Sequence, residues 1–285
     1  MKILYKFSLV ILFTVILISC DEITSDYKQS INQNIDTSQN PRKILIEDYT
    51  GFKCGNCPRA AEKARDIAAL YPGRVIVMAV HASGYYSEPD KVHTYDFRTT
   101  EGTEWDEFFG ISKIGNPNGM VNRIEYDGSR VISDAKWDAV VQSLLKSEPV
   151  MNIELKAYYS MSRKEITVEA VVKYLKDGKS SHQIVVCILE DSIVQYQHYY
   201  NHTPQDIEDY VHNHVLRATL NSTWGEALYA GDIKTGSVFR KSYKYTIPAG
   251  KDWRPEKLKI VAFVHDNGTK EILQAEETDK IILIL

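Results

Sequence analysis

The pattern of apolar and polar positions divides the chain into four stretches. Residues 7–18 are almost wholly apolar, whereas residues 21–42 are polar and show no usable periodicity. Residues 43–148 combine continuous apolar runs with segments of helical period. From residue 149 onward, apolar and polar residues alternate with the period of two that is typical of half-buried strands. We therefore expect an α/β domain followed by an all-β domain.

The start of the α/β stretch predicts a strand–helix–strand unit. Lys43–Tyr49 and Arg74–His81 are apolar runs of the length of buried strands. Pro58 suits the first turn of the helix between them, and Pro72-Gly73 ends it. Two strands joined in this way lie parallel, with the helix as the crossover. The remaining elements predicted for this domain are a short helix over 104–109, a strand over 120–126, its hairpin partner over 130–133 and a helix over 134–146.

The alternating stretch predicts an antiparallel β-sandwich of the immunoglobulin-like kind, because it holds about seven short strands separated by turns. Lys176-Asp177-Gly178-Lys179 and Asp266-Asn267-Gly268 supply two of those turns. The strand candidates include residues 151–159, 166–174, 183–189, 211–220, 238–247 and 258–265.

The first twenty residues have the pattern of an export signal. Two lysines precede the apolar run, and Leu17-Ile18-Ser19-Cys20 closes it. These four residues match the bacterial lipobox, in which the cysteine thiol receives a diacylglycerol before cleavage. We expect residues 1–19 to be a signal peptide, Cys20 to be lipidated, and residues 20–42 to form a flexible tether. The alternative is an uncleaved membrane anchor whose cysteine is incidental.

Length and charge limit the classes of function. The chain has 285 residues, which suits two domains, and we expect these to span 43–148 and 149–285. Its hydrophobic fraction of 44% and charged fraction of 25% are ordinary for a globular protein. A net charge of −4 argues against nucleic acid as a partner and against electrostatic adhesion to anionic lipid. The membrane contact is therefore expected to be the lipid on Cys20.

A pair of cysteines, Cys54 and Cys57, lies where the first strand leads into the first helix. Exposed N–H groups and the positive end of the helix dipole stabilise a thiolate on the first cysteine. A thiolate is the nucleophile of thiol–disulfide exchange, and the second cysteine can then release the partner. Asp48, near the end of the strand, could move protons during exchange. The alternative for Asp48 is an exposed acid at a strand end.

Pro117 is a further candidate for this site, whereas Cys187 is expected to lie elsewhere. Pro117 precedes the hairpin strand, and a cis-proline there could pack beside the disulfide and shape a groove for a peptide. The alternative is a simple loop proline. Cys187 lies in an apolar strand and is expected to be a small buried hydrophobe.

The order of elements, the cysteine motif at the first helix and Pro117 before the hairpin resemble thioredoxin. The resemblance implies that Cys54 is the attacking thiol, Cys57 the resolving thiol and Pro117 the cis-proline that faces them. It also places Asp48 at the position of the buried acid. The spacer Gly55-Asn56 departs from the Gly-Pro that is usual there.

The whole chain resembles the 28-kDa outer-membrane-protein family of Bacteroidetes. The features that carry this resemblance are the lipobox, the polar tether, Glu47–Gly51 leading into Cys54–Pro58, the β-rich tail and the segment Tyr210–Arg217. The resemblance implies a lipoprotein of the cell envelope that is anchored by lipid in the outer membrane.

Three functions remain open from the sequence. We expect thiol–disulfide exchange on cysteine-containing envelope proteins, which needs no cofactor beyond the cysteines. The rival is a binding or adhesion module in which Cys54–Cys57 is a structural disulfide. A metal site is a weaker possibility, either a zinc half-site at the cysteines or a site at His212 and His214, which would share one face of a strand.

Overall fold

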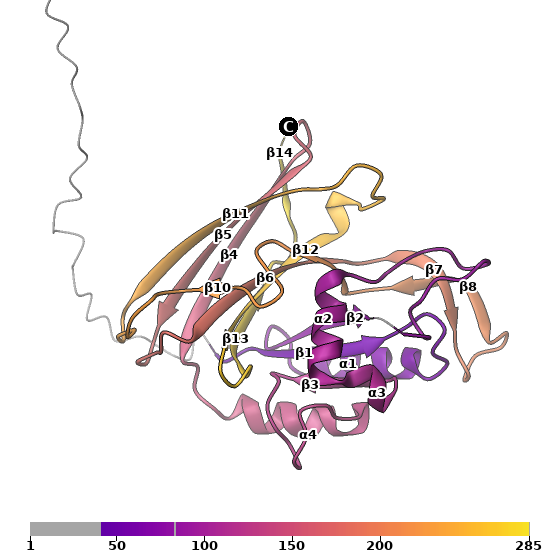
Figure 1. Cartoon of the computed structure of the whole chain (residues 1–285), viewed down its shortest axis with the longest axis horizontal. Coiled ribbons are helices and arrows are strands. Elements are labelled where there is room, and N and C mark those ends of the chain that lie inside the picture. The colour runs from indigo at the N-terminus through magenta and orange to yellow at the C-terminus, as the bar shows by residue number, and fades with distance from the viewer. Residues whose placement is uncertain (1–40, 83, 285) are drawn as a thin grey trace, which may run out of the picture. The chain divides into compact units, whose positions relative to one another are not determined.

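The fold is mixed α/β with β-sheet predominant. A computed structural model describes residues 41–82 and 84–284, so the expected signal peptide, the lipidation site at Cys20 and nearly all of the tether lie outside the described residues. The described chain contains an eight-stranded sheet, a four-stranded sheet and a two-stranded sheet (Figure 1).

The predicted strand–helix–strand unit is confirmed. β1 (Ile44–Thr50) and β2 (Val75–His81) pair in parallel, and α1 (Cys57–Leu70) connects them. All seven residues of each strand are buried, because helices cover both faces of this part of the sheet. α1 has a proline in its first turn, as expected.

Helices lie on the two faces of this unit. α1 and α4 (Asp134–Leu145) pack against one face, where Ile44 and Ile46 join the same apolar cluster as Ala64 and Val140. α2 (Thr100–Phe109) covers the other face through Trp105, and α3 (Ile111–Ile114) follows it. Consecutive residues of β1 therefore enter two different environments.

The predicted hairpin over 120–126 and 130–133 is wrong in its extent. β3 (Asn118–Val121) pairs with β1 in antiparallel fashion but ends at Val121. Asn122 and Arg123 follow with φ of 47° and 51°, a left-handed conformation that ends the extended run. Between the two segments only the isolated bridges Gly119–Ile132 and Tyr126–Ser129 are described.

The eight-stranded sheet takes strands from both sides of the expected boundary at 148/149. Its order is β13-β12-β6-β9-β2-β1-β3, and β10 pairs with β6 off this path. β9 joins β2 in parallel at Ala79 and Val215, and the Ala79 N–H donates to the carbonyl of His214 at 2.8 Å. The further strands of this sheet are β6 (His182–Glu190), β9 (Val215–Thr219), β10 (Glu226–Ala227), β12 (Leu258–Asp266) and β13 (Ile272–Glu277).

A sandwich is present, but one of its layers is the end of this same sheet. The four-stranded sheet has the order β11-β5-β4-β14, and its inward residues share a core with β6 and β12. Ile184 and Ile188 face this core, whereas Val185 and Leu189 face the cluster beneath α2. The continuous apolar run of β6 reflects burial on both faces. The remaining elements are β4 (Met151–Ser160), β5 (Glu165–Tyr174), β11 (Val238–Thr246), a 3-10 turn (Pro255–Lys257) and β14 (Ile282–Ile284).

The single strand predicted over 211–220 is wrong. β8 (Asp206–His212) pairs with β7 (Ile193–His198) in a separate two-stranded sheet, and β9 starts only at Val215. His214 lies between them with φ of 58°. Its N–H donates to a carboxylate oxygen of Asp191 at 2.7 Å, which holds the break in place. His212 and His214 therefore do not share one face of a strand, contrary to the prediction.

Candidate functional site

The two cysteines of the motif form a disulfide. Cys54 lies in the loop after β1, and Cys57 is the first residue of α1, with 5.4 Å between their Cα atoms. The loop is tight, because the N–H of Cys54 donates to the Gly51 carbonyl at 3.0 Å. Cys54 is 2% exposed and Cys57 1% exposed. The disulfide is thus at the predicted strand-to-helix junction but is covered in this structure. Cys187 is a free, buried thiol, as predicted.

Asp48 is buried behind the cysteines. It is 1% exposed, so the alternative of an exposed acid at the strand end is wrong. Burial, with a smaller contribution from the nearby Asp134 carboxylate, raises the pKa of Asp48 to about 8. At neutral pH the Asp48 carboxyl group therefore carries a proton. Its Oδ1 atom has no hydrogen-bond partner among the described residues.

Asp48 and Cys57 line one small chamber. Its volume is about 70 Å³, enough for about two water molecules. His81, at the end of β2, is 2% exposed, and neither of its ring nitrogens has a partner in the described chain. Unpaired buried polar atoms around a small cavity favour ordered water there. The other residues that line the chamber include Thr50, Pro58, Arg65, Gln197, Tyr210, His212 and His214.

The histidines of this chamber are neutral at physiological pH. Burial lowers the pKa of His81 well below its usual value, and His212 and Arg217 lower it further. Burial also lowers the pKa of His212 to about 4, although a hydrogen bond from its ring to the Tyr196 carbonyl at 3.3 Å opposes the shift. These rings can accept or donate a proton through water but carry no charge at rest.

Pro117 lies at the end of β1 where the cysteine loop begins. The Asn116–Pro117 peptide bond is cis. The Asn116 side-chain amide donates to the Thr50 carbonyl at 3.3 Å, and Asn118 is opposite Tyr49 in the sheet. The structure therefore brings Pro117, Asp48 and the disulfide to one end of the sheet.

The β7–β8 hairpin covers the cysteine loop, which the sequence did not predict. The main-chain N–H groups of His198 and Tyr200 donate to the carbonyls of Phe52 and Gly55 at 2.8 and 2.9 Å. The Gln197 side-chain amide donates to the Cys54 carbonyl at 3.1 Å. All of these acceptors are main-chain carbonyls, which every residue type offers, so no residue pattern could have announced the contact.

The structure gives no support for a metal site. No group of three or more His, Cys, Asp or Glu side chains within 41–82 and 84–284 is arranged to hold a metal ion. Cys54 and Cys57 bond to each other, and His214 has Asp191 as a neighbour at 3.4 Å. His212 and His214 nevertheless line the disulfide chamber rather than a separate site.

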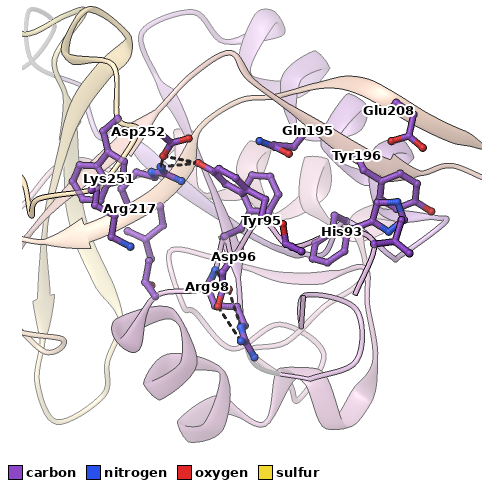
Figure 2. A pocket seen from close by; sticks show the side chains of 18 residues that line it. His93, Tyr95, Asp96, Arg98, Gln195, Tyr196, Glu208, Arg217, Lys251 and Asp252 are labelled. Carbon is purple, nitrogen blue, oxygen red and sulfur yellow. Dashed lines mark hydrogen bonds and ion pairs between the residues drawn. The ribbon is translucent and has the colours of Figure 1, made fainter. Parts of the chain in front are cut away.

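A larger open cleft of about 520 Å³ is also lined in part by the hairpin. Figure 2 shows Gln195, Tyr196 and Glu208 of the hairpin on one wall, with Asp96 and Arg98 opposite. The guanidinium group of Arg98 bonds both oxygens of Asp96 at 2.9 Å. In the same cleft, Arg217 donates to the Tyr95 hydroxyl at 2.9 Å and to Asp252 at 3.2 Å.

Comparisons with known proteins relate the chain to envelope proteins. The family described as "Outer membrane protein Omp28" matches residues 104–280. HBP35 of Porphyromonas gingivalis has a similar fold, with a TM-score of 0.62 and 18% identity over 85% of this chain and 77% of that one. A domain of the outer membrane lipoprotein Omp28 from Porphyromonas gingivalis is 24% identical, covering 48% of this chain and 92% of that one with a TM-score of 0.34.

No curated protein matches the chain. Among the described residues, no helix combines the length and the apolar character needed to cross a membrane. The match to the family extends over more than half of the sequence and includes the end of α2, all of α4 and most of the β-strands. The chain therefore belongs to the Omp28 family of outer-membrane proteins.

Proposed function

We propose that this outer-membrane protein is anchored by a diacylglycerol on Cys20 and exchanges disulfides with cysteine-containing envelope proteins. The observation that carries the proposal is the Cys54–Cys57 disulfide at the start of α1, with the protonated carboxyl group of Asp48 in the same chamber as Cys57. A dithiol pair at a helix start and an adjacent proton donor are the groups that exchange requires.

The arrangement of elements supports a thioredoxin-like unit in residues 43–148. A parallel pair, β1 and β2, is joined by α1, and β3 runs antiparallel to β1. α4 lies on the same face as α1, and a cis-proline precedes β3. In this unit Cys54, Cys57, Pro117 and Asp48 would form the site.

The exchange step begins with attack by a thiolate of the partner on the Sγ atom of Cys54. A mixed disulfide forms, and the Cys54–Cys57 bond breaks with its electron pair on the Sγ atom of Cys57. A second thiolate of the partner then attacks the mixed disulfide. The partner leaves oxidised by two electrons, and the protein keeps two reduced cysteines.

Asp48 can serve the leaving sulfur. A thiolate formed on Cys57 would be buried, because Cys57 is 1% exposed, and a buried charge is unfavourable. The Asp48 carboxyl group, with a pKa of about 8, holds a proton at neutral pH and can pass it to Cys57 directly or through a water molecule. Asp48 thus makes the reduced state accessible without leaving a bare thiolate inside.

A binding module with a structural disulfide is the second candidate. The observation in its favour is the burial of both sulfurs beneath the β7–β8 hairpin. The open cleft of about 520 Å³ would then be the site that contacts a partner. A structural disulfide predicts a reduction potential too negative for exchange.

The deciding experiment is the reduction potential of the pair, measured on the soluble form from residue 41 onward by equilibration with glutathione and trapping of free thiols. We expect a value between about −120 and −270 mV, the range of exchange proteins. A value below about −300 mV would mark a structural disulfide and favour the binding module.

Turnover of a peptide dithiol provides the second readout. Cys54→Ser should abolish exchange, because it removes the sulfur that is attacked. Cys57→Ser should also abolish oxidation of the dithiol, since the protein then has no disulfide to reduce; with a disulfide-containing peptide it should instead trap the mixed disulfide on Cys54, because the resolving thiol is missing. Cys187→Ser is the matched control, because Cys187 is a free buried thiol outside the chamber. Unchanged turnover in Cys54→Ser would exclude the exchange function.

A further inference from the structure

The cysteine loop holds the β7–β8 hairpin by its main-chain carbonyl groups. The N–H groups of His198, the last residue of β7, and of Tyr200, in the turn that follows, donate to the carbonyls of Phe52 and Gly55. Main-chain N–H groups belong to every residue type except proline, and a bound peptide commonly uses them to attach to exposed carbonyl groups. The loop therefore presents acceptors that the main chain of another polypeptide could also use.

Two side chains of the hairpin also contact the cysteine loop. Gln197 is 2% exposed, and its amide donates to the carbonyls of Cys54 at 3.1 Å and Gly51 at 3.3 Å. The ring of Tyr200 lies against Gly55 so closely that a Cβ atom there would be 2.7 Å from it. Tyr200 is itself 54% exposed, so its ring lies over the loop from the solvent side.

The base of the hairpin has the backbone conformation of a hinge. Ser192 and His214 flank the two strands, with φ of 62° and 58°, which residues other than glycine seldom adopt. Asn213 accepts the N–H of Ser192 at 2.9 Å, and Asp191 accepts that of His214 at 2.7 Å. A few residues at the end of an element that hold unusual φ values can absorb a rotation of that element.

The tip of the hairpin is held by hydrogen bonds, whereas its base is packed in an apolar cluster. Near the base, Ile193 packs with Phe52, Phe97 and Val215 in a small apolar cluster. The segment beyond residue 196 contacts the loop through the hydrogen bonds given above, and the Tyr199 hydroxyl reaches Glu62 of α1 at 3.2 Å. A two-stranded sheet is only marginally stable by itself. The tip can therefore leave the loop while the base remains packed.

We infer that the β7–β8 hairpin is a displaceable cover that occupies the binding place of an extended segment of the partner polypeptide. The inference rests on the proposed exchange function and names its partner by chemistry. The partner segment supplies main-chain N–H groups in place of those of His198 and Tyr200, and it carries a cysteine that reaches Sγ of Cys54. Displacement of the hairpin is thereby coupled to peptide binding.

The first test is the rate at which reduced glutathione, a cysteine-containing peptide, reduces Cys54–Cys57. Gln197→Ala removes two hydrogen bonds from the hairpin to the loop, and we expect reduction to be about tenfold faster than in the parent protein. Gln195→Ala is the matched control, because Gln195 lies on the same strand but lines the open cleft. Its rate should stay within about twofold of the parent rate. Equal rates in all three proteins would overturn the inference.

The second test uses the parent protein, so it does not depend on a variant that folds. In amide hydrogen exchange, the N–H groups of His198 and Tyr200 should exchange at least about a hundredfold faster than those of Val186 and Ile188 in β6, because the hairpin opens without global unfolding. Protection of both groups to the level of β6 would show that the hairpin opens only when the whole protein unfolds. That result would refute the inference that the hairpin is a displaceable cover.

The two proposals fail in different ways. If the hairpin opens locally and Gln197→Ala accelerates reduction, but the potential lies below about −300 mV, the cover is correct and the exchange function is not. The opposite result is a reduction potential in the exchange range and turnover that requires Cys54, with Gln197→Ala and Gln195→Ala reduced at the same rate. In that case the exchange function is correct and the hairpin is not a displaceable cover.

Discussion

Two neighbouring acids on β1 have opposite surroundings. Glu47 faces the α2 side of the sheet, where Arg123 donates to its two carboxylate oxygens at 2.8 and 2.7 Å. Both side chains of that pair are 0% exposed, and the guanidinium group lies 5.0 Å from the ring centres of Trp105 and Phe263. Asp48 faces the other side, has an oxygen without a partner and lines a cavity.

The difference separates a structural acid from a reactive one. Burial alone would lower the pKa of Arg123, but the charge and hydrogen bonds of Glu47 raise it above its usual value. Arg123 therefore stays charged, and its bonds to Glu47 fix the chain between β3 and α4. No salt bridge to Asp48 is present among the described residues, and burial keeps it protonated and available to transfer a proton.

Breaking the Glu47–Arg123 ion pair should have the largest effect on the free energy of unfolding. Arg123→Met leaves the Glu47 carboxylate buried without a counter-charge, and we expect the free energy of unfolding to fall by about 3–5 kcal/mol. Urea denaturation measures it. The double variant Glu47→Gln/Arg123→Met should recover part of the loss, since no charge is then left unpaired. A loss below about 1 kcal/mol in the single variant would contradict the structural role of the pair.

Removing the unpaired acid should act in the opposite direction. The pKa of Asp48 is raised on folding, so the folded protein retains a proton that the unfolded chain releases above pH 4. The parent protein therefore loses stability as pH rises from about 4 to 8, by about 1.4 kcal/mol per pH unit at most. Asp48→Asn lacks this loss and should be more stable than the parent by about 2–4 kcal/mol at pH 7.

Urea denaturation of both proteins at pH 4, 6 and 8 tests the assignment of Asp48. The advantage of Asp48→Asn should shrink toward pH 4 and stop growing above pH 8. An advantage that is constant over this range would mean that Asp48 does not titrate there.

Substitution of His81 should have a smaller effect on the free energy of unfolding, and this effect should depend on pH. Its folded pKa is lowered, so the unfolded chain binds a proton below about pH 6.5 that the folded protein does not, and the parent loses stability as pH falls. His81→Phe keeps the ring that stacks on Phe97 at 4.4 Å and removes two unpaired nitrogens. We expect a gain of about 1 kcal/mol at pH 7.5 that increases toward pH 5. Paired thermal melts at the two pH values measure it, and a gain that is smaller at pH 5 would disprove the assignment.

The smallest effect should come from the exposed pair Asp96–Arg98 in the open cleft. Its side chains are 46% and 30% exposed, so water and salt screen their attraction. Arg98→Ala should lower the free energy of unfolding by about 0.2–1 kcal/mol, and 0.5 M NaCl should remove the difference. A larger, salt-resistant loss in urea denaturation would show that this pair resembles Glu47–Arg123 after all.

Local patterns were enough to predict the elements around the disulfide. The runs 43–49 and 74–81 correspond to β1 and β2 within one residue, because apolar continuity and the Pro72-Gly73 stop act over short distances. The positions of the disulfide and of Asp48 follow from the same local spacing. The burial of Asp48 was implied only by the resemblance to thioredoxin, since the apolar run by itself left an exposed acid at the strand end open.

The sequence patterns did not predict contacts between residues far apart in the chain. The alternation over 211–220 continues through His214, yet the strand breaks there because Asp191, 23 residues away, binds its N–H. One part of that run then pairs with β7 and the other joins β2. The same reason explains why the sandwich and the α/β unit share a sheet, since pairing between strands depends on main-chain groups that all residues carry.

The separation between Gln197 and Cys54 also sets an order of events during biogenesis. The cover is 143 residues further along the chain than the sulfur it hides. At a synthesis rate of about 5–20 residues per second, Cys54 and Cys57 emerge on the order of ten seconds before the hairpin exists. Where export accompanies synthesis, an oxidant that acts in the envelope meets the two thiols while they are still exposed, and the hairpin closes over a bond that has already formed.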